Sequence, residues 1–559
     1  MRKVFLPLLM GLVTMVASCT AIPSSGPVIS AQIEATTSSV DVDFLPPGPS
    51  AGATPEEIVA GFIAAGAAAQ DNYRVAKSYL AESVRDEWNP NAGVIIRSGE
   101  PDISVVTNNT VQYVVPAMAS VDELGRYFEG ASSAEQALDF RFTKELGEWR
   151  LSLAPDGVVL TESAFSEAFH SYRLYYFSAG YRELVADVRW FATRGEVSAK
   201  IVRALLEAPS FWLEQGATVS AFPEGTQLAL TPIPVVDGVA RVDLTTAVVS
   251  ADELTRSRMI AQLTASLTQV QGISSATISV NQNELLIPTL GEDGPTLITG
   301  RDPRLAVVKD RRFGFIQARK VELIEPLAAD IATLDAQNVF YSATFGQALV
   351  NRSDGLWRVD GVSEPVLIDP RVTGVRAIMD NCGLVWSSAS QSGPEMLTIV
   401  DQNGQLSPLA LDIGAEASLV SLELARDDTR LLALVQTDTG VRVLLAAVTR
   451  DDDCRPTSLG EFIELAPLAG EAVDAAWVDD STFAVVTKDS LTGVGAAVIF
   501  DSSGRSSSLG QPLAPVALVG GVGGVSGLRL LSEDGAIYQP RGNGWQATGD
   551  RASVLVTQR

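Results

Sequence analysis

The stretch Leu422-Glu-Leu-Ala-Arg-Asp-Asp428, followed by the apolar run from Arg430 to Val435, decides the fold of the C-terminal half of the chain. Ala475-Ala-Trp-Val-Asp-Asp480 repeats the pattern, and a second apolar run follows it from Thr482 to Val486. In each unit, one strand enters an acidic turn and another leaves it. Irregular repeats of about 45–55 residues are typical of the four-stranded blades of a β-propeller.

Turn signals of this kind recur from about residue 300 to the C-terminus, where helical periodicity is absent. We therefore predict an all-β propeller over 296–559, with five or six blades. A pair of β-sandwiches is the alternative fold.

The segment before the propeller, 161–295, carries the signals of a second, mixed domain. Residues 199–206 predict a helix that ends before Pro209, and Ser250 is expected to cap another helix. The apolar residues of that second helix have the 3-4-3 spacing of one helical face, at Ile260, Leu263, Leu267 and Val270. Short strands are expected at 227–230, 239–244 and 276–280. The segment is thus predicted to be a small α+β domain.

A first α+β domain is predicted over 54–160. Thr54, Pro55 and Glu57 form the start signal of a helix, with a capping box and a proline at the first helical position. A second helix is expected over 73–80. Alternating strands follow, at 103–105, 110–115, 138–142 and 148–151. Helices followed by an antiparallel meander predict a curved sheet of the cystatin-like or NTF2-like kind.

The N-terminus has the pattern of a secretory signal. Arg2 and Lys3 precede an apolar run over 4–16 that is too short to span a membrane, and small residues then lead to Cys19. This ending resembles a bacterial lipobox, which implies removal of residues 1–18 and acylation of Cys19 with N-palmitoyl and S-diacylglycerol groups. The alternative is an ordinary export signal with an incidental cysteine. Residues 19–53, rich in Pro, Ser, Gly and Thr, are predicted to be a flexible tether.

The composition of the chain limits the kinds of partner that it can bind. The chain has 559 residues, 46% hydrophobic residues and a formal net charge of −26, which describes a globular, acidic protein. Nucleic-acid binding requires a basic surface, so we expect no nucleic-acid partner. Attachment to a bilayer must come from the acyl chains on Cys19.

The residues that carry common catalytic chemistry are scarce. His170 is the single histidine and is expected to be a partly buried helix residue, so zinc sites and Ser-His-Asp triads are not predicted. The glycines of 520–524 do not open a predicted helix, and the acidic run 451–453 is interpreted as a solvated loop. We therefore expect no enzyme activity, no metal and no cofactor.

Two further features remain open in the sequence. Cys382 and Cys454 would be exposed to an oxidising compartment and are a possible disulfide pair; two separate thiols are the alternative. Aromatic residues cluster around 172–177, Trp190 and Trp212. They form either a stacking surface for sugars or peptides or ordinary core, and the core interpretation is favoured.

Several motifs resemble the actinobacterial LpqB lipoprotein family, and 205–226 resembles a GerMN domain. The residues that carry the resemblance are Ser18-Cys19 with Ile22-Pro23-Ser24, Ser78-Tyr79-Leu80 ahead of Trp88, Gly147-Glu-Trp149-Arg150, Pro155-Asp156-Gly157, Tyr172-Arg-Leu-Tyr175-Tyr176-Phe177, Leu205-Leu206-Glu-Ala-Pro209-Ser210-Phe-Trp212-Leu213 and Phe222-Pro223-Glu224-Gly225-Thr226.

The resemblance implies an accessory lipoprotein at the outer face of the cell membrane. Its expected partner is the extracellular sensor domain of a two-component histidine kinase, with effects on cell-wall and division signalling. The alternative is a lipoprotein that binds cell-wall glycan or muropeptide, with Trp190 and Trp212 as its stacking residues. Only Cys19 is carried over from the family as a functional position.

Overall fold

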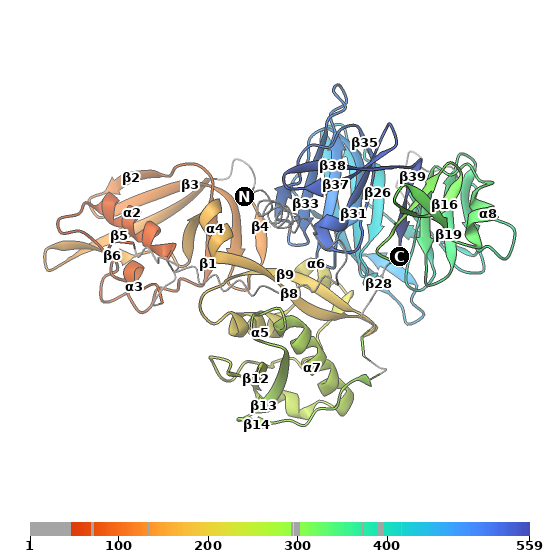
Figure 1. The fold of residues 1–559 in the computed structure, drawn as a ribbon. Helices are drawn as coiled ribbons and strands as arrows, with labels where there is room; N and C mark the ends of the chain where they lie inside the picture. Colours follow the sequence, from red (N-terminus) through yellow and green to blue (C-terminus); the bar gives the residue numbers. More distant parts are fainter. Residues whose placement is uncertain are drawn as a thin grey trace, which may run out of the picture. The chain divides into compact units, whose positions relative to one another are not determined.

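The computed structural model describes residues 46–68, 72–130, 135–291, 294–295, 302–371, 374–388, 396–414 and 416–559. The predicted signal peptide and Cys19 lie outside these residues. The described part contains two α+β domains and a C-terminal set of β-sheets, as the sequence predicts (Figure 1).

The N-terminal domain is a sheet in the order β6-β5-β3-β1-β7, with β2 and β4 also paired to β3. Helix α2 contacts β2, β3, β6 and β7, so its apolar residues close the core. The strands are β1 (Gly93–Arg97), β2 (Asp102–Thr107), β3 (Thr110–Asp122), β4 (Tyr127–Glu129), β5 (Glu135–Glu145), β6 (Glu148–Leu153) and β7 (Val158–Thr161), and the helices are α2 (Pro55–Gly66), α3 (Arg74–Lys77) and α4 (Glu162–Ala168).

The capping box predicted at the start of this domain is confirmed. The Thr54 hydroxyl accepts the Glu57 amide at 3.3 Å, and the Glu57 carboxylate accepts the Thr54 amide at 2.8 Å. Order extends further upstream, because Ala53 is buried and Tyr79 donates to the Pro47 carbonyl at 2.9 Å. The described end of the predicted tether, 46–53, therefore packs on the domain.

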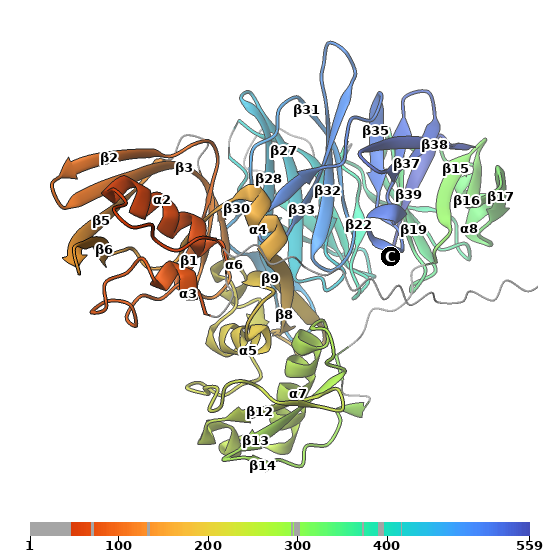
Figure 2. The same ribbon diagram turned by 60° about the vertical axis from the view of Figure 1, so that its left-hand side comes forward.

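The second domain packs two helices between two small sheets, β10-β8-β9 and β11-β12-β13-β14 (Figure 2). Strands β12 and β13 are parallel, and α7 connects them. The elements are β8 (Phe169–Ser178), β9 (Leu184–Ala192), α5 (Val197–Glu207), α6 (Phe211–Glu214), β10 (Thr218–Val219), β11 (Val235–Val236), β12 (Val239–Leu244), the 3₁₀ turn η1 (Thr246–Ser250), α7 (Glu253–Leu267), β13 (Ser275–Val280) and β14 (Asn283–Glu284).

Three predictions for this domain need correction. His170 is exposed and lies in strand β8, because α4 ends at Ala168 and the aromatic run that follows favours the extended conformation. The N-cap of α7 is Asp252, whose carboxylate accepts the Thr255 amide at 2.7 Å. Residues 227–230 form only an isolated bridge, from Leu228 to Leu244, instead of a strand.

Within the described residues, the C-terminal domain contains five sheets: one of eight strands, one of five and three of four. We divide the eight-stranded sheet into blades 1 and 2, and the other sheets are called blades 3 to 6. Blade 1 is β15 (Leu305–Lys309), β16 (Arg312–Gln317), β17 (Lys320–Leu323) and β39 (Val554–Gln558); blade 2 is β18 (Asn338–Ser342), β19 (Gln347–Arg352), β20 (Gly355–Val359) and β21 (Val366–Asp369); blade 3 is β22 (Ile378–Met379), β23 (Val385–Ser388), β24 (Met396–Val400) and β25 (Leu406–Ala410). Helix α8 (Leu327–Ile331) lies between blades 1 and 2 in the sequence.

Blade 4 is β26 (Ser418–Leu424), β27 (Arg430–Thr437), β28 (Gly440–Arg450) and β29 (Pro456–Leu459), with β30 (Ile463–Glu464) added to β28; blade 5 is β31 (Glu471–Trp477), β32 (Thr482–Lys488), β33 (Gly495–Asp501) and β34 (Ser506–Ser508); blade 6 is β35 (Pro515–Val519), β36 (Arg529–Ser532), β37 (Ala536–Arg541) and β38 (Gly544–Arg551), with the 3₁₀ turn η3 (Gly524–Gly527) before β36.

Contacts between neighbouring blades link their first strands. The first strands of blades 2 to 6 contact one another in sequence, and β35 contacts β39. Strand β39 then pairs antiparallel with β15 and parallel with β18, so the end of the chain joins blade 1 to blade 2. The two sequence repeats occupy equivalent positions, as the first two strands of blades 4 and 5.

A buried ionic cluster joins the blades near their first strands. The Arg376 guanidinium donates to Glu423 at 2.6 Å and to Asp474 at 3.2 Å, and all three residues are at most 7% exposed. Asp474 also accepts the Leu518 amide at 2.9 Å. Because these residues come from the start of blade 3 and from β26, β31 and β35, one guanidinium contributes to the alignment of four blades.

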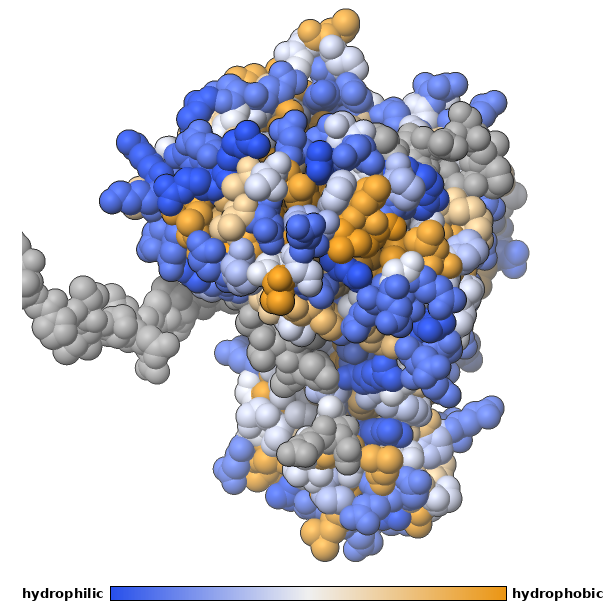
Figure 3. All heavy atoms as spheres, turned by 90° about the vertical axis from the view of Figure 1, so that its right-hand side faces the viewer, coloured by the Kyte–Doolittle hydropathy of each residue, from blue (hydrophilic) through white to orange (hydrophobic). Residues whose placement is uncertain are grey.

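Some of the exposed apolar residues of the propeller lie on its outer strands. Figure 3, which looks at the side bearing α8 and β19, shows apolar residues among polar ones on this surface. Leu323 on β17 and Val366 and Leu367 on β21 remain 39–50% exposed. Outer strands have one unpaired edge, so this side is open to contact.

Candidate functional site: the junction of the three domains

The two tryptophans singled out from the sequence lie where the second domain meets the propeller. Trp212 on α6 is only 4% exposed and packs in one apolar cluster with Val185 of β9 and with Leu432 and Leu434 of blade 4. The core interpretation is thus correct for Trp212. Because so little of it is exposed, Trp212 is mainly a core residue, and a stacking role for it stays a prediction.

Trp190 is half-buried and is contacted from two other domains. Its indole N–H donates to the Ser503 hydroxyl of the propeller at 3.1 Å, and the Arg505 guanidinium lies 4.6 Å from its ring centre. On the other side, the ring packs against Phe165 and Tyr127 of the N-terminal domain, with centroid distances of 5.4 and 6.5 Å. Trp190 therefore joins three domains.

Arg430, at the first position of β27, is the most buried polar link between the second domain and the propeller. Its side chain is 0% exposed and donates to the Ala186 carbonyl of β9 at 3.0 Å. It also donates to Asp427 and to the Asp480 carbonyl, and it lies over the Trp477 ring. The guanidinium thus holds one strand of the second domain against blades 4 and 5.

More exposed polar contacts surround this link. Arg173 of β8 donates to the Ser481 hydroxyl at 2.8 Å and lies 3.4–3.5 Å from Asp479 and Asp480. The Tyr175 hydroxyl donates to Asp480 at 2.6 Å. Exposed ion pairs contribute little free energy, so these contacts mainly set the orientation of the β8–β9 hairpin.

A cavity opens where the three domains meet. Its volume is 240 Å³, and it is lined by residues of β4, by Ser210, Phe211 and Trp212, by β30 of blade 4 and by a turn of blade 5. Phe128 and Phe211 line it and are 46% and 55% exposed. Exposed aromatic residues beside a cavity are typical of an interaction surface.

Asp501 directly precedes the Ser502-Ser503-Gly504 turn that lines this cavity, and it is partly buried. Its carboxylate accepts the Ser503 amide at 2.9 Å, but burial prevails and raises its pKa to about 6. Exposed aspartate has a pKa of about 3.9. The folded state therefore holds this proton more tightly than the unfolded state does.

Asp501→Asn should remove a pH dependence of stability. Because the folded pKa is raised, the free energy of unfolding of the wild type should fall as pH rises from about 4 to about 6, by on the order of 3 kcal/mol. Urea denaturation at several pH values should show a flatter profile for the variant. Asp438→Asn, at an exposed hairpin turn, is the matched control. Parallel profiles for Asp501→Asn and the wild type would contradict the assignment.

The two remaining cysteines also lie close to the second domain. Cys382 and Cys454 form a disulfide with a Cα–Cα distance of 6.4 Å, joining the turn of blade 3 to the acidic loop of blade 4. Arg182, in the β8–β9 turn, donates to the Asp452 carbonyl of that loop at 2.9 Å. The loop 451–453 thus takes part in the domain contact.

Among the described residues there is no group of three or more His, Cys, Asp or Glu side chains placed to hold a metal ion. Within the same ranges, no helix is both long enough and apolar enough to cross a membrane. The described residues define a three-domain, mainly β-sheet protein with packed contacts between its domains.

Comparisons with known proteins agree with this class. Consecutive stretches match three family models: "Lipoprotein LpqB, N-terminal domain" at 48–166, "Sporulation and spore germination" at 173–286 and "Lipoprotein LpqB beta-propeller domain" at 343–554. The chain belongs to the LpqB lipoprotein family.

Similar proteins include two that carry this name. Lipoprotein LpqB of Bifidobacterium longum is 27% identical over 73% of this chain and 72% of its own length. Lipoprotein LpqB of Streptomyces avermitilis is 24% identical over 95% and 94% of the two chains. The first GerMN domain of the sporulation protein GerM from Bacillus subtilis covers 23% of this chain and 94% of its own, with 18% identity and a TM-score of 0.18.

Proposed function

We propose that this protein is a membrane-anchored accessory lipoprotein outside the cytoplasm, which binds and modulates the sensor domain of a two-component histidine kinase and so affects cell-wall and division signalling. The lipobox-like sequence before Cys19 and the name of the relatives support the anchored location. The observation that carries the binding role is the cavity at the domain junction, with exposed Phe128 and Phe211 beside it.

An adaptor role suits this arrangement better than a glycan-binding one. The two stacking residues expected for a glycan site offer little open surface, because Trp212 is buried and Trp190 is covered by Arg505 and by the N-terminal domain. A protein partner instead requires a surface of fixed shape, and the contacts of Arg430 and Trp190 supply that rigidity.

Affinity capture from detergent-solubilised membranes tests the proposed partner. The wild-type chain should recover a sensor kinase, and Phe128→Ala/Phe211→Ala should recover at least about fivefold less, because exposed aromatic anchors dominate interface energies. Leu491→Ala, which alters a 95% exposed apolar residue in blade 5, is the matched control. Capture of no kinase by the wild type, or equal capture by both variants, would refute the proposal.

Cys19→Ala should release the protein from the membrane fraction. Two or more acyl chains anchor a protein stably, and the acidic body adds no attraction to anionic lipid. Fractionation followed by mass spectrometry of the N-terminal peptide provides the measurement. A Cys19→Ala protein that stays with the membrane would show that something other than acylation anchors it.

A further inference from the structure

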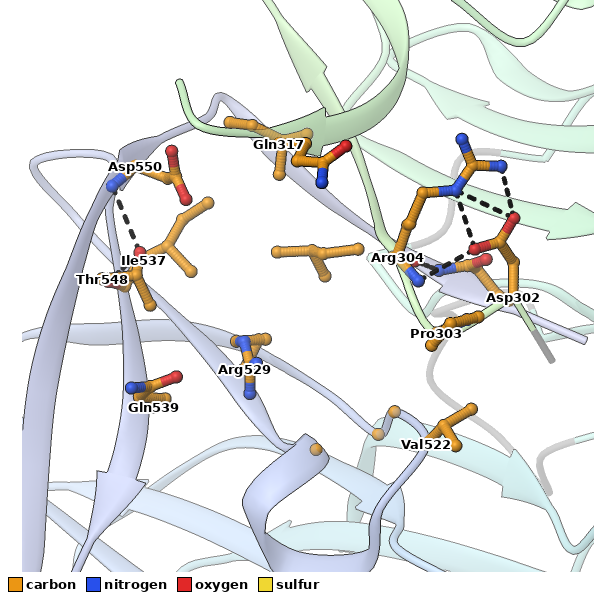
Figure 4. A pocket seen from close by; sticks show the side chains of 16 residues that line it. Asp302, Pro303, Arg304, Gln317, Val522, Arg529, Ile537, Gln539, Thr548 and Asp550 are labelled. Carbon is orange, nitrogen blue, oxygen red and sulfur yellow. Dashed lines mark hydrogen bonds and ion pairs between the residues drawn. The ribbon is translucent and has the colours of Figure 1, made fainter. Parts of the chain in front are cut away.

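A second cavity, remote in sequence from the junction residues, lies between the first and last blades of the propeller. Its volume is 340 Å³, within the range of small-molecule sites. Figure 4 shows side chains from both blades around it, with Gln317 and Arg304 from blade 1 and Arg529, Gln539 and Asp550 from blade 6. The kinase proposal does not involve this cavity.

Arg529 is the unneutralised cation of this cavity. Its Nη1 donates to the carbonyls of Ser526 and Leu528 at 2.8 and 2.7 Å, and no carboxylate in the described part of the chain pairs with it. Burial lowers the pKa of Arg529 because no acidic side chain offsets the lost hydration. Holding a half-buried guanidinium without a carboxylate partner costs free energy. An anionic ligand that pairs with Arg529 would reduce this cost.

Arg304, the other arginine of the lining, is already neutralised. It donates to Asp302 at 2.6 Å and to Glu322 at 2.8 Å, and it stacks over the Phe315 ring at 4.0 Å. The dashed lines in Figure 4 show its pairing with Asp302. An incoming anion therefore meets Arg529 as its one available guanidinium.

The other polar groups of the lining restrict the ligand further. The side-chain amides of Gln539 and Gln317 make no hydrogen bond to the residues the structure describes, so both can bind a ligand amide. Asp550 lines the same cavity and forms no ion pair with Arg529; its carboxylate accepts the Arg319 amide at 3.0 Å. A second negative charge on the ligand would be repelled by Asp550, which disfavours dianionic phosphate.

We propose that this cavity binds a small ligand with one carboxylate next to an amide, as at the C-terminal end of a short peptide. Arg529 binds the carboxylate and Gln539 binds the neighbouring amide. Val522, which lines the cavity and is 48% exposed, contacts the apolar side chain of the terminal residue. Charge and hydrogen bonding at these three positions determine the preference for a free carboxyl end.

Calorimetric titration of the purified full-length protein tests this inference, with N-acetyl-alanyl-alanine, its C-terminal amide and inorganic phosphate as probes. The acid should bind at least about tenfold more tightly than the amide or phosphate. Arg529→Gln should abolish the preference, and Arg529→Lys should retain part of it. Arg541→Gln, an exposed arginine of β37 outside the cavity, should bind like the wild type.

Thermal unfolding of each variant shows whether a loss of binding reflects a loss of fold. Equal binding of acid and amide, tighter binding of phosphate, or no saturable binding of the acid up to about 10 mM would each overturn the inference. A wild-type preference that survives in Arg529→Gln would do so as well.

Discussion

Arg376→Met is expected to lower the free energy of unfolding by about 3–5 kcal/mol. The guanidinium lies between Glu423 and Asp474, and all three side chains are almost fully buried. Methionine fills a similar volume without charge, so two carboxylates would lose the cation that faces them both. The loss should appear in urea denaturation followed by tryptophan fluorescence.

A matched control separates this effect from the general loss of an ion pair. Arg551 pairs with Asp534 at 3.4 Å, but both side chains are about 60% exposed. Arg551→Met should therefore lower the free energy of unfolding by less than about 1 kcal/mol. If Arg376→Met lowers the free energy of unfolding by no more than Arg551→Met does, the buried cluster does not hold the blades together.

The sequence predicted those elements whose signals are local. The repeats at 422–435 and 475–486 became the first two strands of blades 4 and 5, because an apolar strand, an acidic turn and a second strand lie within one short segment. The capping box at Thr54 is equally local. The helix expected around His170 was wrong, because the aromatic residues there pack as a strand against β9.

The junction could not be predicted to the same extent, because its contacts join residues far apart in the chain. Arg430 and Ala186 are 244 residues apart, and Trp190 and Ser503 are 313 apart. In the sequence, Arg430 looks like an ordinary charged residue at the start of a strand. The aromatic residues near 190 and 212 lie at this junction, but whether they face solvent or another domain depends on the tertiary fold.

Arg430→Met should loosen the second domain from the propeller. The substitution removes the donor to the Ala186 carbonyl of β9 and to the Asp480 carbonyl, and it leaves Asp427 buried without its guanidinium. A broken buried pair of this kind costs about 3–5 kcal/mol. Amide hydrogen exchange in β9 (Leu184–Ala192) should accelerate by at least about a hundredfold, since each 1.4 kcal/mol is a factor of ten.

Arg173→Met is the matched control within the same interface. Arg173 bonds to the same blade 5 turn, yet its side chain is 40% exposed and its carboxylate partners are 32–38% exposed. Solvent competes with those contacts, so the variant should change exchange in β9 by less than about tenfold. If Arg430→Met destabilises blade 4 while β9 exchanges as in the wild type, Arg430 supports only the propeller. Faster exchange in β9 together with weaker capture of the kinase would indicate that the partner recognises the two domains in their fixed arrangement.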